Sequence, residues 1–211
     1  IYYDEKRPFF TRDKSFFDTP INIFYSKRIG GNTFFNGYNY QTIINNAAKL
    51  IGNTNNGLTY GFLSSESLID INKDLLSKRI IKTTTSRLTK DILNENSYIG
   101  IMHTNYRDFQ DASTVYSLDG LISLFNNKLK IDGQTVLSEL NSLNQEGGES
   151  YEISYSDKIL NSRFNILRNN TFDIWLNYER YGKGFNVEHM GYLRRNDFKK
   201  IHYGLAFSTN A

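Results

Sequence analysis

The residues that could carry chemistry in this chain of 211 residues are few and far apart. Its histidines, His103, His189 and His202, do not have the HExxH spacing of a zinc hydrolase. The chain has no GxSxG nucleophile motif and no phosphate-binding glycine loop. It also has no cysteine, which excludes thiolate metal sites and disulfides. We therefore predict no catalytic residue, no metal site and no cofactor, and we expect a protein that is not an enzyme.

Two carboxylate pairs, Asp70/Asp74 and Glu149/Glu152, have a spacing that would permit acid–base chemistry. Such chemistry needs an apolar pocket that raises the pKa of one member of the pair. The sequence offers no sign of such a pocket, so we expect both pairs to be solvated.

The most charged compact motif is RRND, at residues 194–197. Because arginine presents a rigid fork of donors, this motif could bind an anion at the mouth or in the interior of a barrel. The interpretation we favour is an internal salt bridge, with Asp197 or with an acid of residues 1–20, that fixes a turn. Trp175 lies on a polar strand face, where it could stack on a sugar or simply pack. The candidate contacts to a lumen or to a segment inside it are Arg7, Arg28, Trp175, Arg194, Arg195 and Asp197.

The strands that would position these residues are predicted from the alternation of apolar and polar residues along the chain. On both sides of the Asn-rich loop 53–57, apolar residues occupy every second position. One face of the second run carries Leu58, Tyr60 and Phe62, and the other carries Thr59 and Gly61. Small or polar residues opposite an apolar row predict an antiparallel hairpin whose two faces meet different surroundings.

The same unit recurs along the chain, which predicts an all-β, antiparallel up-and-down meander of about 9–10 strands. Residues 1–40 form an irregular aromatic and charged lead-in with one strand, and residues 41–211 form the hairpin meander of the same domain. A short amphipathic helix is expected at 67–77. The predicted strands are the lead-in strand 22–27, the hairpin within 46–67, and then 82–93, 98–107, 116–124, 129–138, 151–156, 162–167, 172–180 and 200–208.

A soluble barrel or sandwich would turn the apolar rows inward, whereas a membrane barrel would turn them toward lipid. Strands of about ten residues match a bilayer, and the other face carries charges in mid-strand, as a wet or plugged lumen would. Aromatic residues near strand ends resemble interfacial girdles. We favour the transmembrane barrel. The charges are Lys130, Asp132, Asp173 and Glu179, and the aromatics are Tyr98, Tyr106, Tyr116, Tyr151, Phe172, Tyr178 and Tyr181.

A formal net charge of +3, with basic residues scattered along the chain, indicates no nucleic-acid partner. The chain stops at residues 208–211 without the aromatic residue that ends a bacterial barrel. Unpaired sheet edges in lipid cost several kcal/mol per exposed backbone group, so we expect the sheet to close or to continue in further sequence.

The segments that fit generic strands least well resemble a known family. EKRPFF at residues 5–10 and IFYSKRIG at 23–30 are similar to the "EKRPFF … LFYSRRIG" signature of the barrel domain numbered 5916 among domains of unknown function. Residues 48–54 resemble its "AKLTGKT" hairpin, and 185–197 resemble its "FNPDLGFLRRND" stretch. Thr11-Arg12 and Val187-Glu188 depart from the family pattern, which affects the local loop shapes.

The resemblance covers about residues 4–208 and implies a fragment of a barrel in the outer membrane of a Gram-negative bacterium. It implies outer-membrane lipid as a partner, a covalently linked domain similar to the family-nine carbohydrate-binding modules, and a possible glycan. The expected role is structural or transport-related. The alternatives are a membrane anchor or interaction scaffold without transport, a membrane-associated hydrolase, and a soluble β-barrel or sandwich binding protein.

Overall fold

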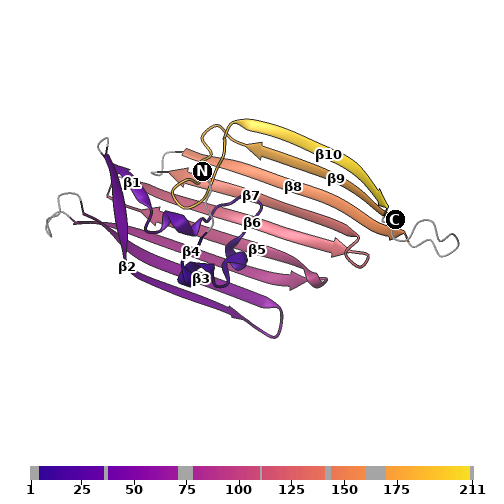
Figure 1. Ribbon diagram of the computed structural model, residues 1–211, viewed down its shortest axis with the longest axis horizontal. Helices are drawn as coiled ribbons and strands as arrows, with labels where there is room; N and C mark the ends of the chain where they lie inside the picture. The colour runs from indigo at the N-terminus through magenta and orange to yellow at the C-terminus, as the bar shows by residue number, and fades with distance from the viewer. Residues whose placement is uncertain are drawn as a thin grey trace.

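The computed structural model describes residues 5–35, 38–70, 78–109, 111–140, 144–159 and 170–209. Side chains are described for 5–33, 40–69, 79–109, 111–140 and 173–207. Ten antiparallel strands pair in sequence order, from β1 at one edge to β10 at the other (Figure 1). The strands are β1 (Asn32–Phe35), β2 (Tyr38–Asn53), β3 (Leu58–Asp70), β4 (Lys78–Ile92), β5 (Asn94–Arg107), β6 (Ala112–Leu124), β7 (Leu129–Leu140), β8 (Asn144–Ile159), β9 (Asn170–Tyr181) and β10 (Phe198–Thr209).

The described helices are single turns in the N-terminal segment: α1 (Pro8–Thr11), η1 (Lys14–Phe17) and η2 (Ser26–Arg28). Proline at the first position of α1 suits a helix start, because its missing N–H would be unpaired there in any case. We call residues 5–31 the plug, since they lie in front of the curved sheet, against one of its faces (Figure 1). The half-barrel therefore has an inner face, toward the plug, and an outer face.

Turn residues explain why the strands reverse where they do. Gly57 has a φ of 75° and its N–H donates to the carbonyl of Thr54, which closes the β2–β3 hairpin. Asn126 and Asn127, with φ of 56° and 67°, form the β6–β7 turn. Asparagine tolerates this left-handed conformation better than most residues with a Cβ.

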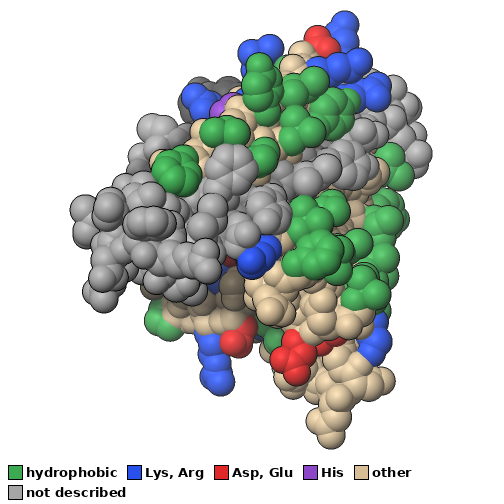
Figure 2. Space-filling view, turned by 90° about the vertical axis from the view of Figure 1, so that its right-hand side faces the viewer, with side chains coloured by type: hydrophobic (Ala, Val, Ile, Leu, Met, Phe, Trp, Pro, Cys, Tyr) green, Lys and Arg blue, Asp and Glu red, His purple; other side chains and the backbone are tan. Residues whose placement is uncertain are grey.

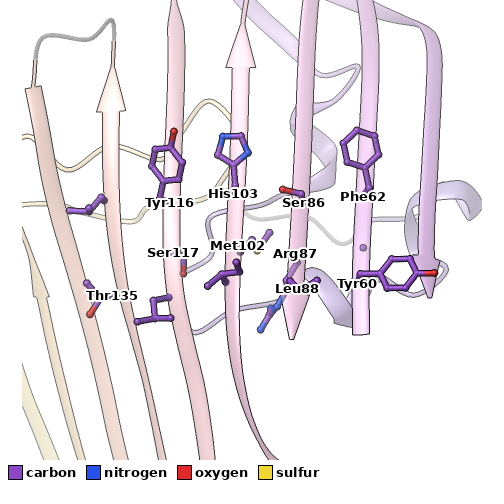
Figure 3. Close-up of a pocket in the computed structure, with 14 residues that line it drawn as sticks. Tyr60, Phe62, Ser86, Arg87, Leu88, Met102, His103, Tyr116, Ser117 and Thr135 are labelled. Carbon is purple, nitrogen blue, oxygen red and sulfur yellow. The ribbon is translucent and has the colours of Figure 1, made fainter. Parts of the chain in front are cut away.

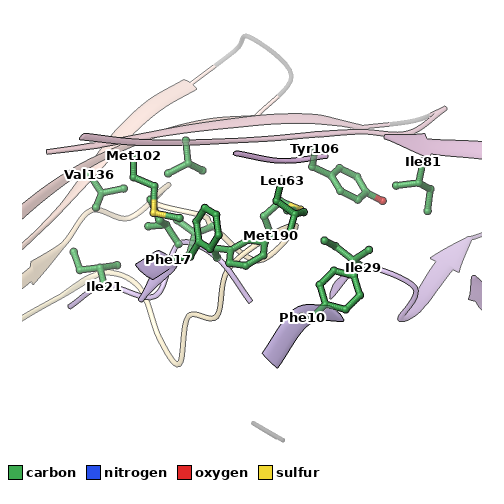
Figure 4. Packing of buried hydrophobic residues seen from close by; sticks show 14 of the residues in the cluster. Phe10, Phe17, Ile21, Ile29, Leu63, Ile81, Met102, Tyr106, Val136 and Met190 are labelled. Carbon is green, nitrogen blue, oxygen red and sulfur yellow. The ribbon is translucent and has the colours of Figure 1, made fainter. Parts of the chain in front are cut away.

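The hydrophobic core lies between the inner face and two covering segments. One is the plug, and the other is the loop of residues 182–197 between β9 and β10. Figure 4 shows Phe10, Phe17 and Ile21 of the plug facing Leu63 and Met102 of the sheet, with Met190 of the loop among them. These side chains are buried because the plug supplies the apolar cover that the inner face of the sheet would otherwise lack.

The all-β meander and its hairpins are confirmed. The predicted strand 22–27 is wrong, because this stretch is irregular, ends in η2 and packs on the sheet instead of joining it. The predicted helix 67–77 is wrong over its first four residues, which continue β3, and the rest lies outside the described residues. The expected strand 162–167 also lies outside them. Residues 144–149, expected as a connection, already belong to β8.

Candidate functional site

The outer face of the sheet carries rows of exposed apolar side chains on the strands whose side chains are described. Tyr60 and Phe62 keep 39% and 44% of their surface exposed, so the row through them points away from the core, as expected. The strand register aligns apolar residues across neighbouring strands. One row runs Tyr60, Leu88, Ile101, Leu118, and the next runs Phe62, Ser86, His103, Tyr116, Leu137. In Figure 2 hydrophobic side chains gather along the side of the sheet that faces away from the plug.

These two rows line a shallow depression of about 690 Å³ on the outer face. Figure 3 shows Phe62, Ser86, His103 and Tyr116 side by side on four neighbouring strands. His103 packs against Tyr116, with 5.0 Å between ring centroids. The next row toward the ends of these strands is polar, and it marks one border of the apolar surface: Ser64, Thr84, Asn105, Thr114 and Glu139.

The inner face has the opposite character, because small and polar residues alternate inward along the same strands. Its buried polar residues include Ser65, Thr83, Thr85, Thr104, Ser117, Gln134 and Ser138. Several of them bond one another across strands, as Ser65 does with Thr83 at 2.6 Å. Others bond the covering segments. Gln134 accepts from the backbone N–H of Ile21 in the plug, and Ser138 accepts from the N–H of Asn186 in the loop.

A buried ion pair joins Arg87 of β4 to Asp119 of β6 across the intervening strand β5. The side chains can meet because β5 presents Gly100 between them. A Cβ added at Gly100 would lie 3.2 Å from Asp119 Oδ1. Arg87 also donates to the carbonyl of Asp18 at 2.6 Å, so the pair in the wall holds the plug directly.

A second buried network lies inside the plug. Arg7 forms an ion pair with Glu5 at 2.7 Å and donates to the carbonyls of Ser26 and Ile29. The Ser26 hydroxyl donates to the same carboxylate. Burial by itself would raise the pKa of Glu5, but the hydrogen bonds from Arg7 and Ser26 and the charge of Arg7 outweigh it and lower this pKa to about 2. The plug therefore has a charged, internally bonded centre.

Arg7, predicted as a lumen or plug contact, lies within the plug network itself. Arg28 joins the plug to the loop, because its Nε donates to the carbonyl of Gly191 at 3.2 Å. Trp175 faces inward on β9 and covers Gly204 of β10, its direct cross-strand partner. A Cβ at Gly204 would overlap the Trp175 ring, so packing accounts for the position of this tryptophan.

Arg194, Arg195 and Asp197 lie in the loop before β10. Among the described residues no ion pair joins Asp197 to either arginine, so the internal salt bridge favoured from the sequence is not part of the described structure. The turn is fixed instead by backbone bonding, since the N–H of Asp197 donates to the carbonyl of Gly182 at 3.3 Å. Arg194 and Arg195 line a cavity of about 790 Å³ beside the plug.

Aromatic residues divide between the two faces. Tyr106 is buried on the inner face with its hydroxyl donating to Asp108, and Tyr98 and Tyr181 also point inward. The expectation that these three belong to a lipid-facing girdle is therefore wrong. Sequence periodicity alone could not correct it, because both faces of β5 carry large residues.

No constellation for catalysis is described. The described residues contain no group of three or more metal-binding side chains. His103 points outward, His202 lies on β10 near Trp175, and His189 lies 3.7 Å from Asp111. The side chains of the pairs Asp70/Asp74 and Glu149/Glu152 lie outside the described residues. No helix in the described part of the chain is long and apolar enough to cross a membrane.

Sequence reasoning missed Arg87, Asp119 and Gln134, the wall residues that hold the plug. A signal existed, since charged and amide side chains fall in mid-strand on the face opposite the apolar rows. Residues 1–210 match the family described as a domain of unknown function, DUF5916. The chain belongs to this family. Searches of curated proteins and of solved structures found no match to it. What a DUF5916 domain does must therefore be argued from its own geometry.

Proposed function

We propose that this DUF5916 chain forms part of the wall of a β-barrel in the outer membrane of a Gram-negative bacterium, with a structural or transport-related role. The single observation that carries the proposal is the inverted polarity of the sheet. Its inner face is lined with buried serine, threonine and glutamine and covered by the plug, whereas its outer face exposes rows of Ile, Leu, Phe and Tyr. Exposed apolar surface of this extent is unusual on a water-soluble monomer and is what lipid tails require.

The height of the apolar surface supports this proposal. On the outer face of β6 it extends from Tyr116 to Leu124, with Gly120 at its middle. The eight steps between these two residues cover roughly 27 Å, and a tilt of about 40° reduces this to roughly 20 Å along the membrane normal. That value is close to the apolar band of about 25 Å found on membrane barrels.

The plug favours a second function, a membrane anchor or scaffold that conducts nothing. The wall holds it through Arg87, Gln134 and Lys49, whose ammonium donates to the carbonyl of Phe9. Chain that is hydrogen-bonded to the wall occupies space that a water path through the barrel would need. The likeness of residues 5–10 and 185–197 to their family motifs supports a linked carbohydrate-binding domain, which the anchor would hold at the membrane.

Site-directed spin labelling tests the membrane proposal, because the chain has no cysteine to remove. Leu118→Cys and Leu205→Cys place labels on the outer face. The matched control is Ala206→Cys, whose exposed side chain is adjacent to Leu205 on the opposite face of β10. In vesicles, we expect the two outer labels to be relaxed by oxygen and shielded from a water-soluble nickel chelate. Outer labels that the chelate reaches as easily as the control would overturn the proposal.

Planar-bilayer recording separates the two functions. A scaffold predicts no steady conductance from the complete protein, and openings that appear only when the plug is weakened, as in Gly61→Val. A stable conductance in the unmodified protein would favour transport instead.

A further inference from the structure

The cavity beside the plug has walls from three separate parts of the chain. The plug contributes residues 20–22, the loop contributes 192–195, and the paired ends of β9 and β10 contribute 179, 181 and 198–200. Its volume of about 790 Å³ is within the range of small-molecule sites. We call it the β9–β10 cavity. Residues that line it lie 180 positions apart in the sequence, so the cavity exists only when the plug is docked.

The charge of this cavity is positive. Among the residues whose side chains are described, Arg194, Arg195, Lys199 and Lys200 line it against a single carboxylate, Glu179, which lies 3.9 Å from the Lys200 ammonium. Arg194 has no ion-pair partner in the described part of the chain. Both guanidinium groups belong to exposed residues and are within reach of a ligand, and a guanidinium is the side chain best suited to a carboxylate or a phosphate.

The position of Arg195 is fixed by a stack of rings. Its guanidinium carbon lies 5.3 Å from the centroid of Phe198, which packs on Tyr181 at 4.7 Å. Tyr181 in turn packs on Phe185 at 5.5 Å. A cation held over an aromatic face loses less freedom on binding an anion than a free side chain would.

Asn22 adds an uncharged polar residue to the lining of the cavity. Its side-chain oxygen Oδ1 is buried, so a ligand in the cavity does not reach it. The cations are therefore the groups on which recognition depends, because charge-assisted hydrogen bonds are the strong ones. We propose that the β9–β10 cavity binds a small anionic ligand that carries a phosphate or carboxylate group. Its acidic group pairs with Arg194 and Arg195.

Calorimetric titration of the complete protein in detergent micelles tests this proposal, and it depends on neither a bilayer nor a conductance. The probes are glucose 6-phosphate, glucose and inorganic phosphate. We expect glucose 6-phosphate and inorganic phosphate to bind and glucose not to bind, because only the first two carry a group that engages the cations. Absence of saturable binding, or equal affinity for glucose 6-phosphate and glucose, would overturn the proposal.

Variants locate the site. Arg195→Gln should weaken glucose 6-phosphate binding at least about 10-fold, since hydrogen bonds to charged groups are the strong ones. Asn22→Asp should do the same, because it adds a negative charge to the lining of the cavity. The matched control is Arg180→Gln, an exposed arginine of β9 that does not line the cavity. Equal losses in Arg180→Gln and Arg195→Gln would mean general charge attraction and would contradict the assignment.

Discussion

The two faces of the sheet differ in burial, because side chains on the inner face are covered by the plug and the loop, whereas apolar side chains on the outer face stay exposed. On β5, Ile99 and Ile101 point outward and stay exposed, whereas Met102 and Thr104 point inward and are buried. The inner face is half polar and needs a protein cover that can satisfy its hydrogen bonds. The outer face presents few groups that need a partner, so a medium without hydrogen bonding can cover it. The residue composition of each face therefore indicates whether protein or an apolar medium lies against it.

The largest expected effect on the free energy of unfolding comes from removing one partner of the ion pair between Arg87 and Asp119, on the inner face. Arg87→Met leaves Asp119 buried without its cation, which typically costs about 3–5 kcal/mol. We expect that loss in urea unfolding in detergent micelles. Replacing both members, as in R87M/D119L, should recover most of it, because no uncompensated charge remains. A double variant as unstable as the single one would show that the pair matters through its bond to Asp18 and not through charge.

Matched leucines on the two faces test the contrast directly. Leu63→Ala removes a fully buried inner side chain and should cost about 2–5 kcal/mol by the same unfolding measurement. Leu88→Ala removes an exposed outer side chain, which lies against detergent in both states, and should cost less than about 1 kcal/mol. Equal costs would contradict the assignment of the faces.

Lowering the pH should destabilise the plug, on the inner face, before it affects the outer face. The folded pKa of Glu5, about 2, lies below the unfolded value of 4.5. The stability contributed by its charge is therefore complete above about pH 5 and is lost as the pH falls toward 2. It amounts to at most about 3 kcal/mol. Unfolding free energies of the native protein and of Glu5→Gln should converge over this window. A gap between them that does not change with pH would contradict the role of the charge.

The smallest effect is expected from crowding a tightly packed position on the inner face. A Cβ at Gly61 would lie 2.5 Å from the ring of Phe16, so Gly61→Val should cost about 1–3 kcal/mol by pushing η1 away. Ser86→Val adds similar bulk on the outer face, in the open depression, and should change stability by less than about 0.5 kcal/mol. Faster proteolysis within residues 5–31 of Gly61→Val alone would locate the change in the plug.

Strand positions could be predicted from the sequence because alternation is a local property. The β6–β7 hairpin, for example, follows from its apolar rows and from Asn126 and Asn127. The plug could not be predicted in this way. Residues 22–27 carry the β-branched and aromatic residues of a strand, but Pro20 precedes them and their apolar side chains insert under the sheet. Arg87 and Asp119 meet only because of the register across β5, which no local pattern specifies.

The bonds that fasten the plug also set an order of assembly. Ile21 bonds Gln134, 113 positions later, and Arg28 bonds Gly191, 163 positions later. These plug residues precede their partners by more than half of the chain, and contacts between residues so far apart form slowly. During that interval the inner face of the half-barrel is uncovered. A chaperone that covers residues 5–31 and the inner face until the plug docks would protect both surfaces from aggregation during this interval.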